Sequence, residues 1–113
     1  MLVPNAKHAV IPAAKLGDYL LSAAHPRGRG KARFFQSFGF MPSAPEILER
    51  ALRKHILDHD IARIHQSAHG VKYEIEGPLP SPDGRAPVVR SVWIIDAGEI
   101  RPRFITAIPG PRR

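Results

Sequence analysis

The residues best suited to act on an anion gather in one short segment, residues 25–33, with the sequence HPRGRGKAR. Its two glycines permit close approach of the backbone to a ligand, and a helix that begins near them favours an anion at its N-terminus. The glycine spacing differs from that of a Walker phosphate loop, so the segment predicts contact with a phosphate backbone rather than a nucleotide site. The side chains that would make these contacts are His25, Arg27, Arg29, Lys31 and Arg33.

Two residues of this segment could do more than bind. An imidazole transfers protons near neutral pH, so His25 is a candidate general acid or base, although a histidine before a proline is also typical of a helix end. Lys31 lies four residues before Phe35 and seven before Phe38. On a helix this spacing places the lysine beside an apolar face, where it is either held near a site or extends its ammonium to solvent.

Two further histidines, His55 and His59, have the i, i+4 spacing that would suit a pair of metal ligands on a helix. No third ligand accompanies them, and His55 shares an apolar stripe, so we predict no metal site. The chain has no cysteine, which excludes disulfides and thiolate metal sites. We therefore predict no cofactor, and any chemistry must use the other polar side chains.

The chain carries a net charge of +7 over 113 residues, and this charge is unevenly spread. Residues 1–43 carry a net +5 and residues 84–113 a net +4, whereas residues 44–83 between them carry a net −2. A fold that brings the two basic segments together would attract a polyanion, either a nucleic acid or an acidic protein. Basic residues scattered for solubility would give the same totals, and the sequence leaves both interpretations open.

The elements that position these residues follow from hydrophobic spacing and from the prolines and glycines that interrupt it. A chain of 113 residues has the usual length of one domain, here residues 1–113, with a helical part over 12–58 and a sheet over 61–108. Apolar residues at helical spacing predict about three N-terminal helices. The first runs from Pro12 to before His25, the second covers about 31–38, and the third follows a capping box at 43–46 and includes 47–58.

From residue 61 onward the pattern changes to the alternation of polar and apolar residues that is typical of strands. The fold class is therefore α+β, with the helices packed on one face of a four-stranded antiparallel sheet and the other face free to bind a ligand. If the last strand is regular, Arg103 and Thr106 fall on its opposite faces. The predicted strands cover 61–65, 71–76, 88–95 and 103–108.

The chain has no apolar run near the roughly 18 residues that cross a bilayer, and its first residues lack the apolar part of a signal peptide. We therefore expect a cytoplasmic protein without a membrane partner.

Four short motifs, spread over nearly the whole chain, resemble those of an uncharacterised family of small bacterial domains. The family in turn resembles, more distantly, the barnase-like, EndoU-like and colicin-type ribonuclease toxins, which often finish on a strand ending in Thr-Ala-Tyr-Pro. Here that ending is Thr-Ala-Ile-Pro, without the tyrosine. The motifs are His25-Pro-x-Gly-x-x-Lys31-Ala-x-Phe-Phe, Gly77-Pro-Leu-x-x-Pro-Asp83-Gly-Arg85, Val92-Trp-Ile-Ile-Asp96 and Phe104-Ile-Thr106-Ala-x-Pro109.

The resemblance implies a metal-independent endoribonuclease of a toxin or toxin–antitoxin system, with RNA as its substrate and an acidic antitoxin or immunity protein as its partner. Under this hypothesis His25 transfers a proton, Lys31 and Arg90 bind the phosphate, and Thr106 orients an oxygen. The residues expected to bind the flanking RNA backbone are Arg27, Arg29, Arg33, Lys72 and Arg103.

Two other functions fit the same sequence. A non-catalytic module could bind nucleic acid or an acidic protein through the same basic surface, and it would leave RNA uncut. A protein-interaction subunit could use an exposed sheet edge, for example to form a homodimer.

Overall fold

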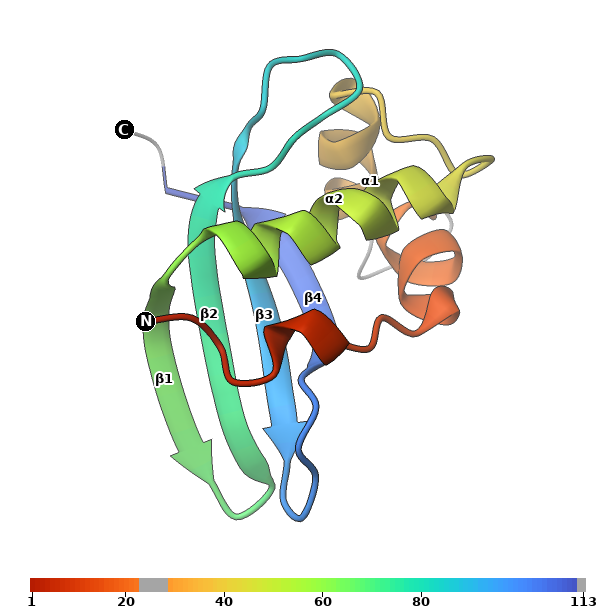
Figure 1. Ribbon diagram of the computed structural model, residues 1–113. Helices are drawn as coiled ribbons and strands as arrows, with labels where there is room; N and C mark the ends of the chain where they lie inside the picture. The colour runs from red at the N-terminus through yellow and green to blue at the C-terminus, as the bar shows by residue number, and fades with distance from the viewer. Residues whose placement is uncertain (23–28, 112–113) are drawn as a thin grey trace.

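Four consecutive strands form the antiparallel sheet on which the molecule is built (Figure 1). Neighbours in the chain are neighbours in the sheet, in the order β1-β2-β3-β4. The alternation of residues predicted the four strands. The structure is a computed structural model that describes residues 1–22 and 29–111. The strands are β1 (Ile61–Ser67), β2 (Gly70–Pro78), β3 (Val88–Asp96) and β4 (Arg103–Pro109).

A two-residue turn between β1 and β2 sets the register of the first hairpin. Ser67 pairs with Gly70 across this turn. Gly70 has a φ of 141°, and a Cβ atom there would meet the backbone of Ile95 and Asp96, so the position requires glycine. The turn therefore fixes which side chains of β1 stand beside those of β2. β1 forms one edge of the sheet and is exposed over most of its length.

Helix α2 (Pro45–Asp58) lies across one face of the sheet (Figure 1). Its buried stripe includes Leu48, Leu52 and Ile56, as the apolar spacing predicted. The helix begins with Pro45 in its first turn, where a backbone N–H would have no hydrogen-bond partner within the helix. Its N-cap residue is Ala44, which makes no side-chain hydrogen bond to the helix. The expected capping box at 43–46 is therefore wrong.

Helix α1 (Arg29–Ser37) contacts β4, the strand at the other edge of the sheet (Figure 1). The ring of Phe35 is fully buried, and those of Phe34 and Phe38 pack against the core from partly buried positions. Lys31 lies one turn before Phe35 on the same helix. The buried ring thus anchors the part of the helix from which the lysine extends.

The expectation of about three N-terminal helices is wrong: the described residues contain two α-helices, one of them in the middle of the chain. The segment after Pro12 instead forms a short 3-10 turn (Ala13–Lys15) and a single π-helical turn (Leu16–Leu20). Another 3-10 turn covers Ala6–His8. None of the described helices is long and apolar enough to cross a bilayer.

Burial of three leucines explains why this segment departs from an α-helix. The N–H of Leu21 donates to the carbonyl oxygen of Leu16 at 2.8 Å, five residues earlier. With this wider turn, Leu16, Leu20 and Leu21 are all buried. Gly17 within the turn lowers the intrinsic preference for an α-helix, so the burial of the leucines decides the local structure.

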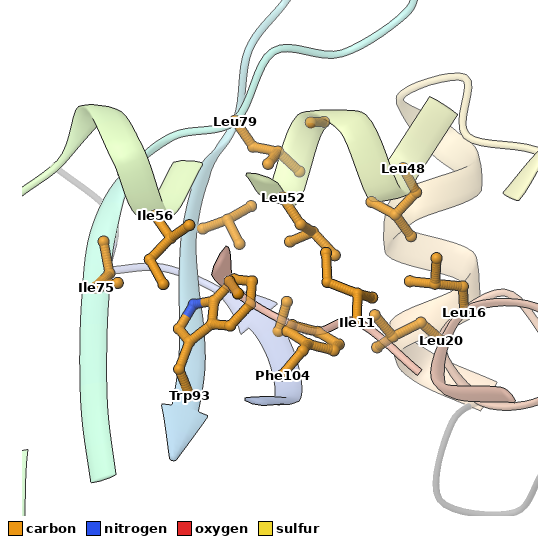
Figure 2. Close-up of a cluster of buried hydrophobic side chains, with 14 of the residues drawn as sticks. Ile11, Leu16, Leu20, Leu48, Leu52, Ile56, Ile75, Leu79, Trp93 and Phe104 are labelled. Carbon is orange, nitrogen blue, oxygen red and sulfur yellow. The ribbon is translucent and has the colours of Figure 1, made fainter. Parts of the chain in front are cut away.

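The core lies between α2 and the sheet and extends toward the N-terminal turns (Figure 2). Trp93 and Phe104 stand edge to face at its centre, with ring centroids 5.2 Å apart. Figure 2 shows Leu52 and Ile56 of α2 beside these rings. This packing fixes β3 and β4 relative to α2, and so fixes the opposite face of the same strands.

Candidate functional site

The candidate site lies on the face of the sheet turned away from α2, here termed the open face. Ser91 and Trp93 of β3 are buried on the α2 side, so the alternating residues Arg90 and Val92 point to the opposite side. Paired residues on neighbouring strands share a face, which extends this assignment across the sheet. The open face consists of Arg63, His65, Lys72, Glu74, Glu76, Arg90, Val92, Ile94, Arg103, Thr106 and Ile108.

A bulge in β4 brings Thr106 and Arg103 onto this same face. Thr106 pairs with Val92 and Arg103 pairs with Ile94, with a register shift between the two pairs. Ile105 is the extra residue of the bulge. The prediction that Thr106 and Arg103 lie on opposite faces assumed a regular strand, and it is wrong for this reason.

Lys31 of α1 reaches the sheet at Thr106. Its ammonium donates a hydrogen bond of 3.2 Å to the Thr106 hydroxyl, and the contact is partly buried. The hydroxyl oxygen accepts this bond and keeps its own proton as a donor. An ammonium and a hydroxyl held together in this way can both donate to the oxygens of one bound anion.

Arg90 lies one strand further in, on β3, as a diagonal neighbour of Thr106. Its guanidinium donates to Oε1 of Glu76 through Nη2 at 2.8 Å and through Nε at 3.1 Å. The Nε atom also lies 3.5 Å from Oε1 of Glu74. The guanidinium of Arg90, which the sequence hypothesis expects to bind a phosphate, is therefore in contact with two carboxylates.

His65 of β1 continues this group of polar contacts. Its Nε2 atom lies 2.7 Å from Oε2 of Glu74. An ionised carboxylate can only accept, so in the neutral ring Nε2 carries the hydrogen and Nδ1 has the lone pair. The Glu74 side chain is 15% exposed and that of His65 is 52% exposed, so the ring faces solvent while the carboxylate is largely enclosed.

One apolar residue separates the two polar groups of the open face. Thr106, Val92 and Glu74 are in register across β4, β3 and β2. Strands lie about 4.8 Å apart, so the Cα atoms of Thr106 and Glu74 are about 10 Å apart. The Lys31–Thr106 pair and the pair of His65 and Glu74 thus stand on either side of Val92, and Arg90 lies two residues before Val92 on the same strand.

The sequence analysis missed the pair of His65 and Glu74, and the register of the first hairpin is the information that would have predicted it. The turn makes His65 face Lys72 and stand diagonal to Glu74. The alternation along β2 predicted that Lys72, Glu74 and Glu76 share a face, and they do. Register, however, depends on the loop length, and a slip of one residue would have moved His65 to the other face.

The other predicted cations differ in their surroundings. Arg103 binds Asp96 through two hydrogen bonds of 3.0 Å, and this hydrogen bonding holds the pKa of the Asp96 carboxyl below its usual range. Lys72 on the open face and Arg33 on α1 are exposed.

Three residues of the basic segment cannot be placed with the others. His25 and Arg27 lie outside the described residues. Arg29 begins α1, but its side chain lies outside the described part.

The loop between β2 and β3 holds the end of α1. The guanidinium of Arg85 donates to the carbonyl oxygen of Ser37 at 2.6 Å and lies 4.3 Å from the centre of the Phe38 ring. Asp83 accepts from Arg85 Nε at 2.6 Å, and hydrogen bonds from Ser81 and then from Arg85 lower the pKa of its carboxyl to about 2. This motif therefore fixes the helix that carries Lys31.

The two histidines of α2 join the helix to the sheet. His55 is fully buried, with Nδ1 2.8 Å from the Ser91 hydroxyl and Nε2 3.0 Å from the carbonyl oxygen of Gly77. Burial lowers the pKa of His55 to about 4, so the ring is neutral near pH 7. Trp93 donates to the same hydroxyl at 2.9 Å.

Over residues 1–22 and 29–111, no group of three or more His, Cys, Asp or Glu could hold a metal ion.

Comparison with solved structures finds a chain of the contact-dependent growth inhibition toxin–immunity protein complex from Klebsiella pneumoniae 342. The TM-score is 0.72 at 21% sequence identity, and the match covers 89% of this chain and 99% of that chain. At this identity the similarity shows a shared fold. No curated protein matches the chain.

The predicted resemblance to an uncharacterised family of small domains is confirmed, whereas the more distant resemblance to ribonuclease toxins stays a prediction. The model of the family described as "Domain of unknown function (DUF6883)" matches residues 2–111. Because this match covers nearly the whole chain, the protein belongs to that family.

Proposed function

We propose that the protein is a metal-independent endoribonuclease of a bacterial toxin system and that it cleaves RNA on the open face of its sheet. The net charge of +7 suits a polyanionic substrate. The fold shared with a chain of a toxin–immunity complex supports the link to a toxin system.

The chemistry needs little from the protein because RNA contains its own nucleophile. The 2′-hydroxyl loses its proton, its oxygen bonds to the adjacent phosphorus, and the bond from phosphorus to the 5′-oxygen breaks as that oxygen takes up a proton. The fragments end in a 2′,3′-cyclic phosphate and a 5′-hydroxyl. The protein must supply groups that move two protons and cations that stabilise the negative charge on the phosphate.

The contact between Lys31 and Thr106 is the observation that carries this proposal. The two residues were selected from separate motifs, and their side chains meet at 3.2 Å. We assign Lys31 to the phosphate and Thr106 to the orientation of one of its oxygens. His25 retains its proposed role in proton transfer.

Arg90 is the second phosphate ligand in this proposal, and its contacts define how it would act. Its side chain is 28% exposed, and its guanidinium is held by Glu76 and Glu74. A guanidinium has five N–H donors in a fixed plane, so it can bind a carboxylate along one edge and a phosphate along another. Arg33, Lys72 and Arg103, together with Arg27 and Arg29, would bind the neighbouring RNA backbone.

The proposed partner is an acidic antitoxin or immunity protein. A toxin that cuts RNA inside the cell that makes it must be blocked until it is delivered, and an acidic surface would compete with RNA for the same cations. Binding of such a partner should therefore weaken as ionic strength rises.

Incubation of the purified protein with RNA in the presence of EDTA tests the proposal. We expect fragments that end in a 2′,3′-cyclic phosphate, and we expect Lys31→Met to reduce their rate of formation by at least about 100-fold. Lys54→Met is the matched control because Lys54 is an exposed lysine on α2, where it pairs with Asp58. Intact RNA with the wild-type protein, or equal cleavage by Lys31→Met, would overturn the proposal.

A further inference from the structure

We infer that His65, oriented by Glu74, is a proton-transfer residue of the open face. This inference rests on the ribonuclease function proposed above and adds to its site two residues that the sequence hypothesis did not include. It assigns the catalytic role to the imidazole and a positioning role to the carboxylate.

The contact between the two side chains determines which ring nitrogen faces the carboxylate. The 2.7 Å contact to Glu74 occupies Nε2, so Nδ1 is the atom that can accept a proton from a substrate. When the ring takes up this proton it becomes a cation beside an enclosed carboxylate, which stabilises it. A carboxylate that orients an imidazole in this way is a recurrent arrangement in proton transfer.

Arg90 supports the carboxylate from the other side. Its Nε atom lies 3.5 Å from Glu74 Oε1, whereas His65 contacts Oε2. Each oxygen of Glu74 therefore faces its own partner, and the plane of the carboxylate is fixed between β1 and β3. An exposed surface ion pair has no such support.

The pair lies on the same face of the sheet as the Lys31–Thr106 contact, with His65 two strands from Val92. A phosphate above Val92 would lie between the Lys31–Thr106 pair on one side and Glu74 on the other, since Thr106, Val92 and Glu74 are in register. The ribose attached to that phosphate would extend toward β2 and β1. Its 2′-hydroxyl would then approach the half-exposed ring of His65.

The proton balance of the step is complete with His65 and solvent water. Nδ1 of His65 takes the proton of the 2′-hydroxyl as the oxygen bonds to phosphorus. The bond to the 5′-oxygen breaks, and that oxygen takes up a proton from solvent water. Lys31 stabilises the charge on the phosphate oxygens during the step.

Steady-state cleavage of an RNA oligonucleotide by single variants tests the inference. His65→Ala should lower kcat by about 100-fold, the range of a lost proton-transfer group. Glu74→Gln should lower kcat by about 10-fold with KM unchanged, because the ring remains but loses its orienting charge. The control is His69→Ala, an exposed histidine at the tip of the same hairpin.

Two further readouts separate this role from a structural one. Thermal unfolding of His65→Ala should stay within a few degrees of the wild type, because the removed ring is half exposed and Glu74 keeps Arg90 as a partner. Affinity for an uncleavable oligonucleotide with 2′-deoxyribose should also be unchanged. Active wild type with His65→Ala of equal kcat would overturn this inference and leave the proposed function standing, whereas inactive wild type would overturn both.

Discussion

The ammonium of Lys31 donates a hydrogen bond to the hydroxyl of Thr106 across 75 positions of the sequence. One residue comes from a helix beside the sheet edge and the other from the edge strand β4. A bulge in that strand turns Thr106 toward the same face as Arg103 and Arg90. The contact therefore joins the basic segment around α1 to the face of the sheet where we propose that RNA binds.

The hydroxyl of Thr106 should matter for cleavage more than for folding. Thr106→Val keeps the shape of the side chain and removes only the hydroxyl, so we expect cleavage to slow by about 10-fold while the melting temperature changes by a few degrees at most. A fluorogenic RNA substrate would measure the rate. Thr106→Ser, which restores the hydroxyl, should recover most of the activity, and a valine variant as active as the wild type would contradict the assigned role.

The buried ring of His55 makes the protein sensitive to mild acid. Burial lowers its pKa to about 4 from the ordinary 6.5, so the unfolded chain binds a proton at a higher pH than the folded one. The contribution to stability is fully present above pH 6.5 and is lost as the pH falls toward 4. The total loss is about 3 kcal/mol in the free energy of unfolding.

Urea denaturation between pH 4 and pH 7 would measure this effect. His55→Gln can keep a donor toward the carbonyl oxygen of Gly77 but cannot titrate, so its stability should vary less over the same range. The difference between the two proteins isolates His55 from the other histidines. Parallel curves for the wild type and the variant would contradict the assignment.

Gly77 should not tolerate a methyl group. A Cβ atom at this position would lie 2.6 Å from Cγ of His59, and the ring would have to leave its 3.0 Å contact with the carbonyl oxygen of Pro78. We expect Gly77→Ala to lower the free energy of unfolding by about 1–3 kcal/mol, the usual cost of overpacking. Gly30→Ala is the control, because a Cβ atom there meets nothing within 4 Å and alanine favours the helix by up to about 1 kcal/mol. Equal melting temperatures for the two variants would contradict this account.

Arg85 should stabilise the protein through the end of α1. Arg85→Ala removes the hydrogen bond to Ser37 and the contact with the Phe38 ring. We expect a loss of about 1 kcal/mol, reduced by the exposure of the side chain, together with slower cleavage because Lys31 is less well held. Arg101→Ala, which changes an exposed arginine in the loop between β3 and β4, should stay within about 0.5 kcal/mol of the wild type. Chemical denaturation and the RNA assay would compare the two.

Much of the fold follows from local patterns in the sequence, and the helix predicted after Pro12 shows where such patterns fail. The alternation along β2 and the apolar stripe of α2 predicted both elements because each buries one side against the same core. The segment after Pro12 has apolar residues at helical spacing too, yet the burial of Leu16, Leu20 and Leu21 produces a π-helical turn. Packing between distant segments determines this turn, and local helix propensity does not predict such packing.

The candidate site was predictable only where a motif of the resembled family included the residue. Lys31 and Thr106 were selected from motifs, and the structure brings them together. Glu74 and His65 were missed because their contact depends on the register of a hairpin. The two carboxylates that hold Arg90 were missed for the same reason, since they come from a neighbouring strand.

The most direct test of the central claim uses an RNA oligonucleotide with one 2′-deoxynucleotide at the cleaved position. If the protein cleaves RNA by attack of the 2′-hydroxyl, the unmodified oligonucleotide yields a fragment with a 2′,3′-cyclic phosphate and the modified one stays intact at that position. Mass spectrometry of the fragments distinguishes the two outcomes. Cleavage of the modified position, or no cleavage of either oligonucleotide, would contradict the account.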